Sequence, residues 1–147
     1  MTRRGQGIVV ALAVIMAIAL VAGGAVVLAS SGSSAKGSPN VIKGNDKPNK
    51  LIGTNRADKI FGYGAGDKIK GRGADDVLKG GKGNDVIGGG KGFDKILGGP
   101  GNDHINARDG HPDEIDCGPG RKDFAKVDRN EDGVFNCETV RSPRGPN

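Results

Sequence analysis

Residues 80–106 read GGKGNDVIG, GGKGFDKIL and GGPGNDHIN, three blocks of nine that repeat glycine, aspartate and an aliphatic residue at fixed places. The same nine-residue period runs without a gap from Gly44 to Asn106. The first position of each block is glycine, at 44, 53, 62, 71, 80, 89 and 98. The sixth position is Asn49, Asp58, Asp67, Asp76, Asp85, Asp94 and Asp103, and the eighth is Leu51, Ile60, Ile69, Leu78, Ile87, Ile96 and Ile105.

One large aliphatic residue in every nine fits neither an amphipathic helix nor an ordinary antiparallel strand. It fits a coil in which each block is a glycine-rich turn followed by a short strand that buries one side chain. Because a single block cannot bury that side chain alone, neighbouring coils must stack. The composition agrees, since a chain of 147 residues with 28 glycines and no tryptophan has little material for a conventional core.

The last three blocks match G-G-x-G-x-D-x-U-x, and the segment resembles the nonapeptides of the repeats-in-toxin (RTX), or hemolysin-type, proteins. The resemblance implies an all-β fold, a parallel β-roll over residues 41–106 with two nonapeptides in each coil. Residues 18 apart would then stack in two aliphatic ladders, Ile42, Ile60, Leu78 and Ile96 in one and Leu51, Ile69, Ile87 and Ile105 in the other.

The resemblance also implies that Ca²⁺ binds between stacked turns, to carboxylates and to backbone carbonyls, the oxygen ligands that this ion prefers. The implied carboxylate ligands are Asp58, Asp76 and Asp94 on one edge and Asp67, Asp85 and Asp103 on the other. The implied carbonyl ligands belong to Gly80, Lys82, Gly89, Lys91, Gly98 and Pro100. The alternative is that these aspartates only cap turns, because Asp and Gly are common turn residues.

The first blocks depart from the motif. Asn49 replaces the aspartate of the first block, and Asn45, Thr54, Tyr63 and Arg72 replace the second glycine of the first four. We therefore expect calcium occupancy to fade towards the N-terminus.

The N-terminal segment is apolar. Arg3 and Arg4 precede an uncharged run from Ile8 to Ala29, which predicts a hydrophobic helix. Residues 1–29 are either a cleaved signal peptide, with candidate cleavage after Ala25, Ala29 or Ala35, or a retained membrane anchor. In both cases the arginines favour an outside location for the body, secreted or anchored to the outer face of the cytoplasmic membrane by residues 8–29. Residues 30–40 are rich in Ser and Gly and predict a flexible linker.

The period slips after Asn106, and we expect an irregular cap over residues 107–147. Cys117 and Cys137 are the only two cysteines, and a disulfide between them is expected in an exported chain. Asp128, Asn130, Asp132 and Gly133 match the first half of an EF-hand loop, and the segment also resembles the short extracellular Excalibur motif. A second calcium site at Asp128, Asn130, Asp132 and Glu138 and a purely structural, polar cap remain equal alternatives.

No enzyme motif is present: His104 and His111 are the only histidines, and no nucleophile elbow, zinc-ligand spacing or phosphate loop occurs. The net charge of +5 includes two charges from Arg3 and Arg4, too few elsewhere to indicate a nucleic-acid binder. We expect a monomeric, non-enzymatic, extracellular calcium-binding protein. The alternatives are an adhesion module whose lysines, among them Lys59, Lys68, Lys82, Lys91 and Lys95, contact an anionic envelope polymer or membrane, and a hemolysin-like accessory protein.

Overall fold

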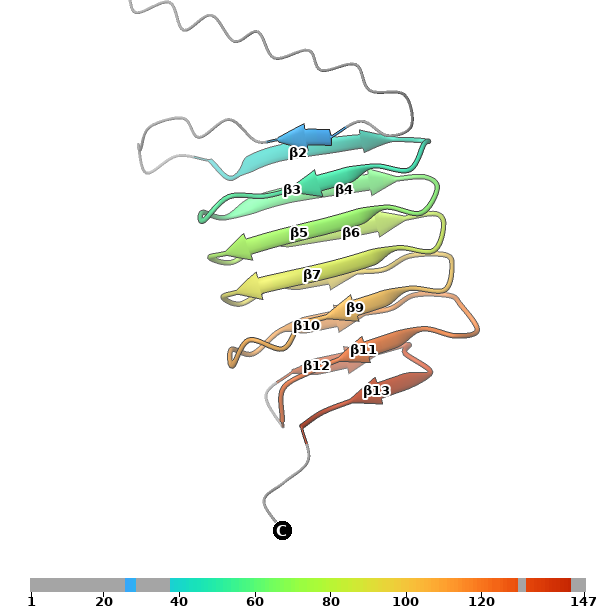
Figure 1. Cartoon of the computed structure of the whole chain (residues 1–147). Helices are drawn as coiled ribbons and strands as arrows, with labels where there is room; N and C mark the ends of the chain where they lie inside the picture. Colours follow the sequence, from blue (N-terminus) through green and yellow to red (C-terminus); the bar gives the residue numbers. More distant parts are fainter. Residues whose placement is uncertain (1–25, 29–37, 130–131, 144–147) are drawn as a thin grey trace, which may run out of the picture.

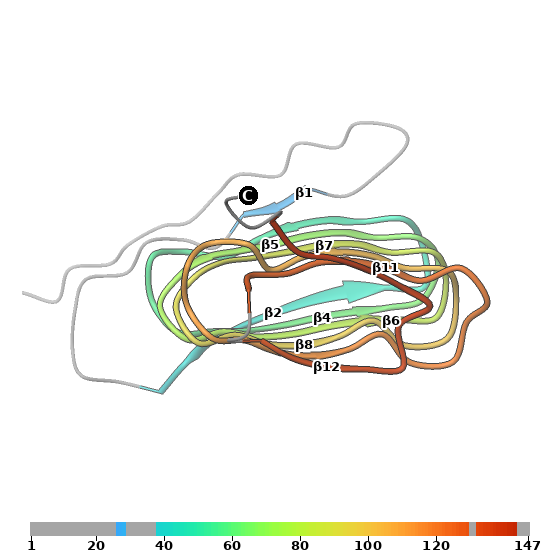
Figure 2. The same cartoon turned by 90° about the horizontal axis from the view of Figure 1, so that it is seen from below.

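The chain winds into a flattened parallel β-roll. The computed structural model describes residues 26–28, 38–129 and 132–143, and shows coils that stack along one axis (Figure 1). Two parallel sheets lie on opposite sides of the coil (Figure 2). The seven-stranded sheet holds, in order, β1 Val26–Leu28, β3 Lys50–Ile52, β5 Lys68–Gly73, β7 Val86–Lys91, β9 His104–Asn106, β11 Phe124–Lys126 and β13 Thr139–Arg141. The six-stranded sheet holds β2 Asn40–Asn45, β4 Asp58–Tyr63, β6 Val77–Gly81, β8 Lys95–Leu97, β10 Glu114–Asp116 and β12 Gly133–Phe135.

The core is the pair of aliphatic ladders that the nine-residue period predicts. In the six-stranded sheet Ile42 pairs with Ile60, Ile60 with Leu78, and Leu78 with Ile96. In the other sheet Leu51, Ile69, Ile87 and Ile105 pair in the same way. All eight side chains are buried, and their inward direction leaves the residues on either side of them facing solvent. The predicted register and the all-β class are confirmed.

The roll does not end at Asn106, which corrects the expected irregular cap. Ile96 pairs with Ile115, and Ile115 pairs with Val134. Ile105 pairs with Ala125, and Ala125 pairs with Val140. The slip in the period is absorbed in the turns, where an added residue lengthens the coil without shifting which side chains face inward.

The predicted N-terminal helix falls largely on residues 1–25, outside the described part of the chain. Its described residues, Val26–Leu28, form a strand, β1, rather than a helix, and pair in parallel with β3. Within the described residues no helix is long and apolar enough to cross a membrane.

Candidate metal centre

The glycine-rich turns place a row of carboxylates inside the roll. Each aspartate stands two residues before a core aliphatic, so the alternation of the strand turns both side chains inward. The buried members, at most 1% exposed, are Asp58, Asp67, Asp76, Asp85, Asp94, Asp103, Asp113 and Asp123. Carboxylates are rarely buried without a compensating partner, so each needs an account of its oxygens.

One oxygen of each carboxylate joins neighbouring coils. The N–H of Asp67 donates to Oδ1 of Asp85 at 2.7 Å, and the N–H of Asp85 donates to Oδ1 of Asp103 at 2.8 Å. These contacts form two ladders that run along the roll. The first ladder is Asp58, Asp76, Asp94, Asp113 and Asp132. The second ladder is Asn49, Asp67, Asp85, Asp103, Asp123 and Glu138.

The other oxygen has no hydrogen-bond partner in most of the turns. Among the residues that the structure describes, the buried Oδ2 atoms without one belong to Asp67, Asp76, Asp85, Asp94, Asp103, Asp113 and Asp123. An unsatisfied buried oxygen costs about 1–3 kcal/mol, and more when it is charged. Seven such atoms lie in two regular rows among the described residues. Their regular placement indicates a partner that the protein chain does not supply, such as an ion.

The first glycine of each block brings a carbonyl to the same place. A Cβ added to Gly62 would meet Asp67 Oδ2 and the carbonyl oxygen of Gly80, both within 2.3 Å. The same overlap occurs at Gly71, with Asp76 Oδ2 and the Gly89 carbonyl within 2.4 Å. Only glycine fits here, and its absence of a side chain lets a carboxylate oxygen and a carbonyl oxygen of the next coil converge.

Burial makes these carboxyls hard to ionise. Loss of water raises the pKa of Asp76 and Asp103 to about 7, although the N–H bond from the preceding coil opposes the shift. The same causes raise the pKa of Asp85 and Asp94 to about 6. Burial is the main cause that raises the pKa of Asp113 to about 8, and the charges of neighbouring aspartates raise it further. The hydrogen bond from the N–H of Asp94 lowers this pKa but does not offset the rise. A cation between the coils would remove this penalty.

The first two turns satisfy their oxygens without an ion. Thr54 donates to Oδ2 of Asp58 from its N–H and, at 3.1 Å, from its hydroxyl. In the block before it, the N–H of Asn45 donates to Oδ1 of Asn49 at 2.8 Å. Of the four residues that replace the second glycine, only Asn45 and Thr54 donate to the sixth-position side chain of their block. In the blocks of Tyr63 and Arg72 the aspartate Oδ2 has no hydrogen-bond partner. The fading of calcium sites towards the N-terminus stays a prediction.

The donor set suits Ca²⁺, a hard cation that binds six to eight carboxylate and carbonyl oxygens. The carbonyls predicted at Gly80 and Gly89 face the aspartate rows, as described above. Those of Gly98 and Pro100 accept hydrogen bonds from the N–H groups of Gly81 and Gly83 in the preceding coil, both at 2.9 Å. The carbonyls of Lys82 and Lys91 stay predicted ligands.

The second predicted site is divided between the two ladders. Asp132 accepts the N–H of Asp113 and ends the first ladder, whereas Glu138 accepts the N–H of Asp123 and ends the second. Asp128 lies beside Asp132, to which its N–H donates at 2.8 Å, and Asn130 lies outside the described residues. In the described part of the chain no group of three or more His, Cys, Asp or Glu side chains could hold a metal ion.

Sequence reasoning missed Asp113 and Asp123 as ladder members. Both keep the spacing of the repeat, an aspartate two residues before an inward-facing side chain, at Asp113 with Ile115 and at Asp123 with Ala125. Counting from the aliphatic residue, instead of from the first glycine, would have found them.

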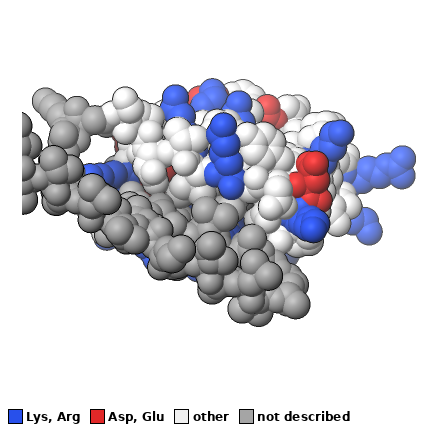
Figure 3. Space-filling model, turned by 90° about the horizontal axis from the view of Figure 1, so that it is seen from above, with Lys and Arg blue, Asp and Glu red and all other residues white. Residues whose placement is uncertain are grey.

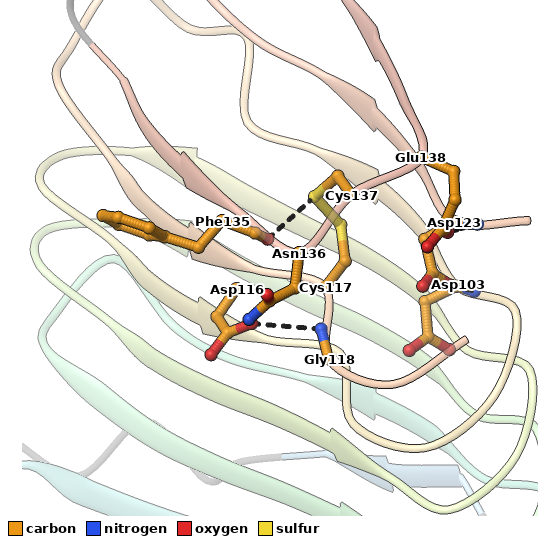
Figure 4. The surroundings of a disulfide bond; sticks show 9 residues. All are labelled: Asp103, Asp116, Cys117, Gly118, Asp123, Phe135, Asn136, Cys137 and Glu138. Atoms are coloured by element: carbon orange, nitrogen blue, oxygen red, sulfur yellow. Dashed lines mark hydrogen bonds between the residues drawn. A yellow bond between two sulfur atoms is a disulfide. The ribbon is translucent and has the colours of Figure 1, made fainter. Parts of the chain in front are cut away.

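A disulfide closes the C-terminal end of the roll. Cys117 and Cys137 are bonded as predicted, with Cα atoms 5.2 Å apart. Cys117 is fully buried and its carbonyl accepts the N–H of Gly99 at 3.0 Å. Figure 4 shows the bond close to the end of the second ladder, where Asp103, Asp123 and Glu138 follow one another. The covalent link thus holds the last coil against the one before it.

Comparison with known protein families identifies the repeat. Four overlapping matches to the family model of the RTX calcium-binding nonapeptide repeat cover residues 43–78, 52–87, 61–96 and 83–111. Neither the curated proteins nor the solved structures provide a match. The family binds Ca²⁺, in agreement with the buried oxygen rows. Residues 43–111 therefore belong to the family of RTX calcium-binding nonapeptide repeats.

Proposed function

We propose that this chain is an extracellular, non-enzymatic protein whose β-roll is held together by calcium ions between its stacked turns. The observation that carries the proposal is the set of seven buried Oδ2 atoms without a partner. Asp67, Asp76, Asp85, Asp94 and Asp103 would hold the ions, together with carbonyls of the adjoining glycine-rich turns. A bound ion supplies positive charge that compensates the buried carboxylates.

A structural role is favoured over catalysis by the surroundings of the histidines. His104 packs edge-on against the Phe124 ring, with the centroids 4.8 Å apart. His111 lies 3.1 Å from Asp109 on the surface. Neither contact joins a histidine to a nucleophile, which a general base would need.

An extracellular location is favoured by two features of the chain. The apolar N-terminal segment follows basic residues, as in export signals and anchors. The disulfide is of the kind that persists in oxidising compartments. Protease digestion of intact cells tests this part of the proposal, because an internal protein would be protected.

Thermal unfolding of the full chain with EGTA and with rising calcium tests the central part. We expect calcium to raise the melting temperature and calorimetry to show saturable binding. Asp67→Asn with Asp85→Asn should reduce both effects, because the change removes two carboxylates but keeps the Oδ1 acceptors. The matched control is Asp46→Asn with Asp75→Asn, the same change at exposed positions. An unaltered melting curve, or equal losses in the two double variants, would overturn the proposal.

A second function, contact with an anionic partner, is favoured by one observation. The strands of the seven-stranded sheet contain lysine and arginine but no aspartate or glutamate. Such a surface suits an interaction module on a calcium-rigidified scaffold.

A further inference from the structure

The outer face of the seven-stranded sheet is basic along its length. Residues that point outward alternate with the buried ladder, so β5 alone presents Lys68, Lys70 and Arg72. The remaining basic residues on the outward side of this sheet are Lys50, Lys126 and Arg141, and Lys91 is exposed at the end of β7. The six-stranded sheet differs, because Glu114 and Asp116 interrupt its lysines and Glu114 pairs with Lys95 at 2.6 Å. On the one face seen in Figure 3, lysine and arginine side chains are more prominent than acidic ones.

Like charges stand in direct register on this sheet. Lys50 pairs with Lys68 across the two strands β3 and β5. Such a pair destabilises a sheet, and a neighbouring acid would cancel the cost. None of the described strands of this sheet contains one. The arrangement therefore favours an external anion over internal ion pairing.

A hollow interrupts the basic face where β7 carries glycine. It has a volume of about 210 Å³ and lies over Gly88, Gly89 and Gly90. Lys70 and Arg72 of β5 line one side, and Asn106 and Arg108 line the other. The side chains that line the hollow are thus three cations and one amide, with no acid among them. The backbone of the three glycines forms the bottom of the hollow.

Packing explains only part of this glycine run. A Cβ on Gly90 would overlap the carbonyl of Arg72, and one on Gly89 would overlap Asp94 Oδ2. A Cβ on Gly88, however, would meet nothing within 4 Å, and its φ lies outside the left-handed region. Packing therefore does not require glycine at position 88. Because glycine at this position keeps the bottom of the hollow open, its presence favours a ligand-binding role for the hollow.

Arg72 occupies a backbone position that suits glycine. Its φ is +93°, and in the next coil its register partner is Gly90, with φ of +115°. A positive φ is unfavourable for an arginine. Tyr63, at the same position of the preceding block, has a φ of +81°, so this conformation belongs to the turn of the repeat. At Arg72 the turn places a guanidinium at the edge of the hollow.

We propose that this face binds a linear phosphodiester polyanion and seats one phosphate in the hollow between Lys70, Arg72 and Arg108. Guanidinium groups bind phosphate with paired, charge-assisted hydrogen bonds, and the lysine adds a point charge. Lys126 and Arg141 continue the basic row on β11 and β13, and strands are about 4.8 Å apart. An extended row of cations fits a polymer better than a single ion. The surface is separate from the inward-facing aspartates, so the inference goes beyond calcium binding.

The test is binding of a fluorescent glycerol-phosphate oligomer to the full chain at constant calcium in a phosphate-free buffer. Lys70→Gln with Arg108→Gln should weaken binding about tenfold or more, since two phosphate contacts are lost. Gly88→Glu should weaken it at least as much by filling the hollow with a negative charge. The matched control is Lys43→Gln with Lys79→Gln, which removes the same charge from exposed positions of the other sheet and should change affinity about twofold or less. Affinity should fall with salt.

Several outcomes would overturn the inference. Equal losses in the two glutamine variants would indicate general basicity rather than a site. Equal affinity for glycerol phosphate and its oligomer would indicate a lone-anion site. Equal affinity for polygalacturonate would exclude phosphate recognition, and binding confined to phosphatidylglycerol vesicles would indicate a membrane surface.

Calcium melting curves of the same variants separate this inference from the proposed function. We expect their calcium response to match that of the unaltered chain. A chain that binds the oligomer but shows no calcium response would remove the proposed function and leave the anion surface in place.

Discussion

The Oγ1 of Thr54 lies 3.1 Å from Oδ2 of Asp58, whereas the equivalent Oδ2 of Asp67, in the next turn, has no hydrogen-bond partner. The turns of two successive blocks thus differ in how the buried carboxylate oxygen is compensated. In the first, the chain supplies the donor. In the second, the oxygen faces a carbonyl, and only a cation or a proton relieves the repulsion.

Thr54→Val should destabilise the roll without altering its calcium sites. The hydroxyl that donates to Asp58 is lost, and the free energy of unfolding should fall by about 1 kcal/mol with and without calcium. Chemical denaturation measures the change. Thr139→Val, at an exposed position, is the control and should stay within about 0.5 kcal/mol. A loss seen only with calcium would mean that Thr54 serves an ion site.

The calcium-free roll should become less stable as pH rises from about 4 to about 8. Burial raises the folded-state pKa of Asp85 and Asp94 to about 6 and that of Asp76 and Asp103 to about 7. Between the unfolded value of about 4 and these values the folded chain binds more protons, so raising the pH favours unfolding.

Melting temperatures at pH 5 and pH 8, with EGTA and with calcium, measure this effect. The stabilisation by calcium should be larger at pH 8, because protons no longer compete for the carboxylates. A calcium-free melting temperature that increases over this range would contradict the assignment of buried, unpaired carboxyls.

Two glycine substitutions should have opposite consequences. Gly62→Ala places a Cβ against Asp67 Oδ2 and the Gly80 carbonyl, and overpacking of this kind costs about 1–3 kcal/mol. Gly88→Ala meets nothing within 4 Å and should be neutral or stabilise by up to about 1 kcal/mol. Denaturation midpoints of the two variants check the pair. Equal losses would mean that the first-position glycines are not required by close approach.

Reduction of the disulfide should loosen the last coil. In the chain-entropy model a loop of about this size stabilises the fold by about 3 kcal/mol. Unfolding curves with and without reductant measure the difference, and peptide mass mapping under non-reducing conditions verifies the Cys117–Cys137 link. An unchanged curve would show that coil stacking alone holds the C-terminal end.

Much of the roll was predictable because the period leaves little freedom. Each nine-residue block has a glycine, an aspartate or asparagine, and an aliphatic residue at fixed places. Only one alignment of neighbouring coils turns every aliphatic side chain inward, and it predicts the ladder from Ile42 to Ile96. The fading of the sites stays a prediction, and its basis in the sequence is that Asn45 and Thr54 break the glycine pattern.

The end of the roll was harder to predict. Extra residues in the turns before Asp113 and Asp123 disrupt a count made from the glycines, although the inward alternation survives. Asp132 and Glu138 are close in sequence, and this closeness suggested a single calcium loop. The sequence does not show that the two side chains end different ladders. The hollow over Gly88 is lined by residues from neighbouring coils. The sequence of one nine-residue block therefore could not predict the hollow.

Hydrogen–deuterium exchange of the full chain with and without calcium tests the central claim most directly. Calcium should slow exchange of the turns that contain Asp67, Asp76, Asp85, Asp94 and Asp103, where a carboxylate oxygen has no partner. Exchange at Asn45–Asn49 and Thr54–Asp58 should change least, because those turns satisfy their own oxygens. Calcium protection confined to these first two turns, or none in the later ones, would contradict the account.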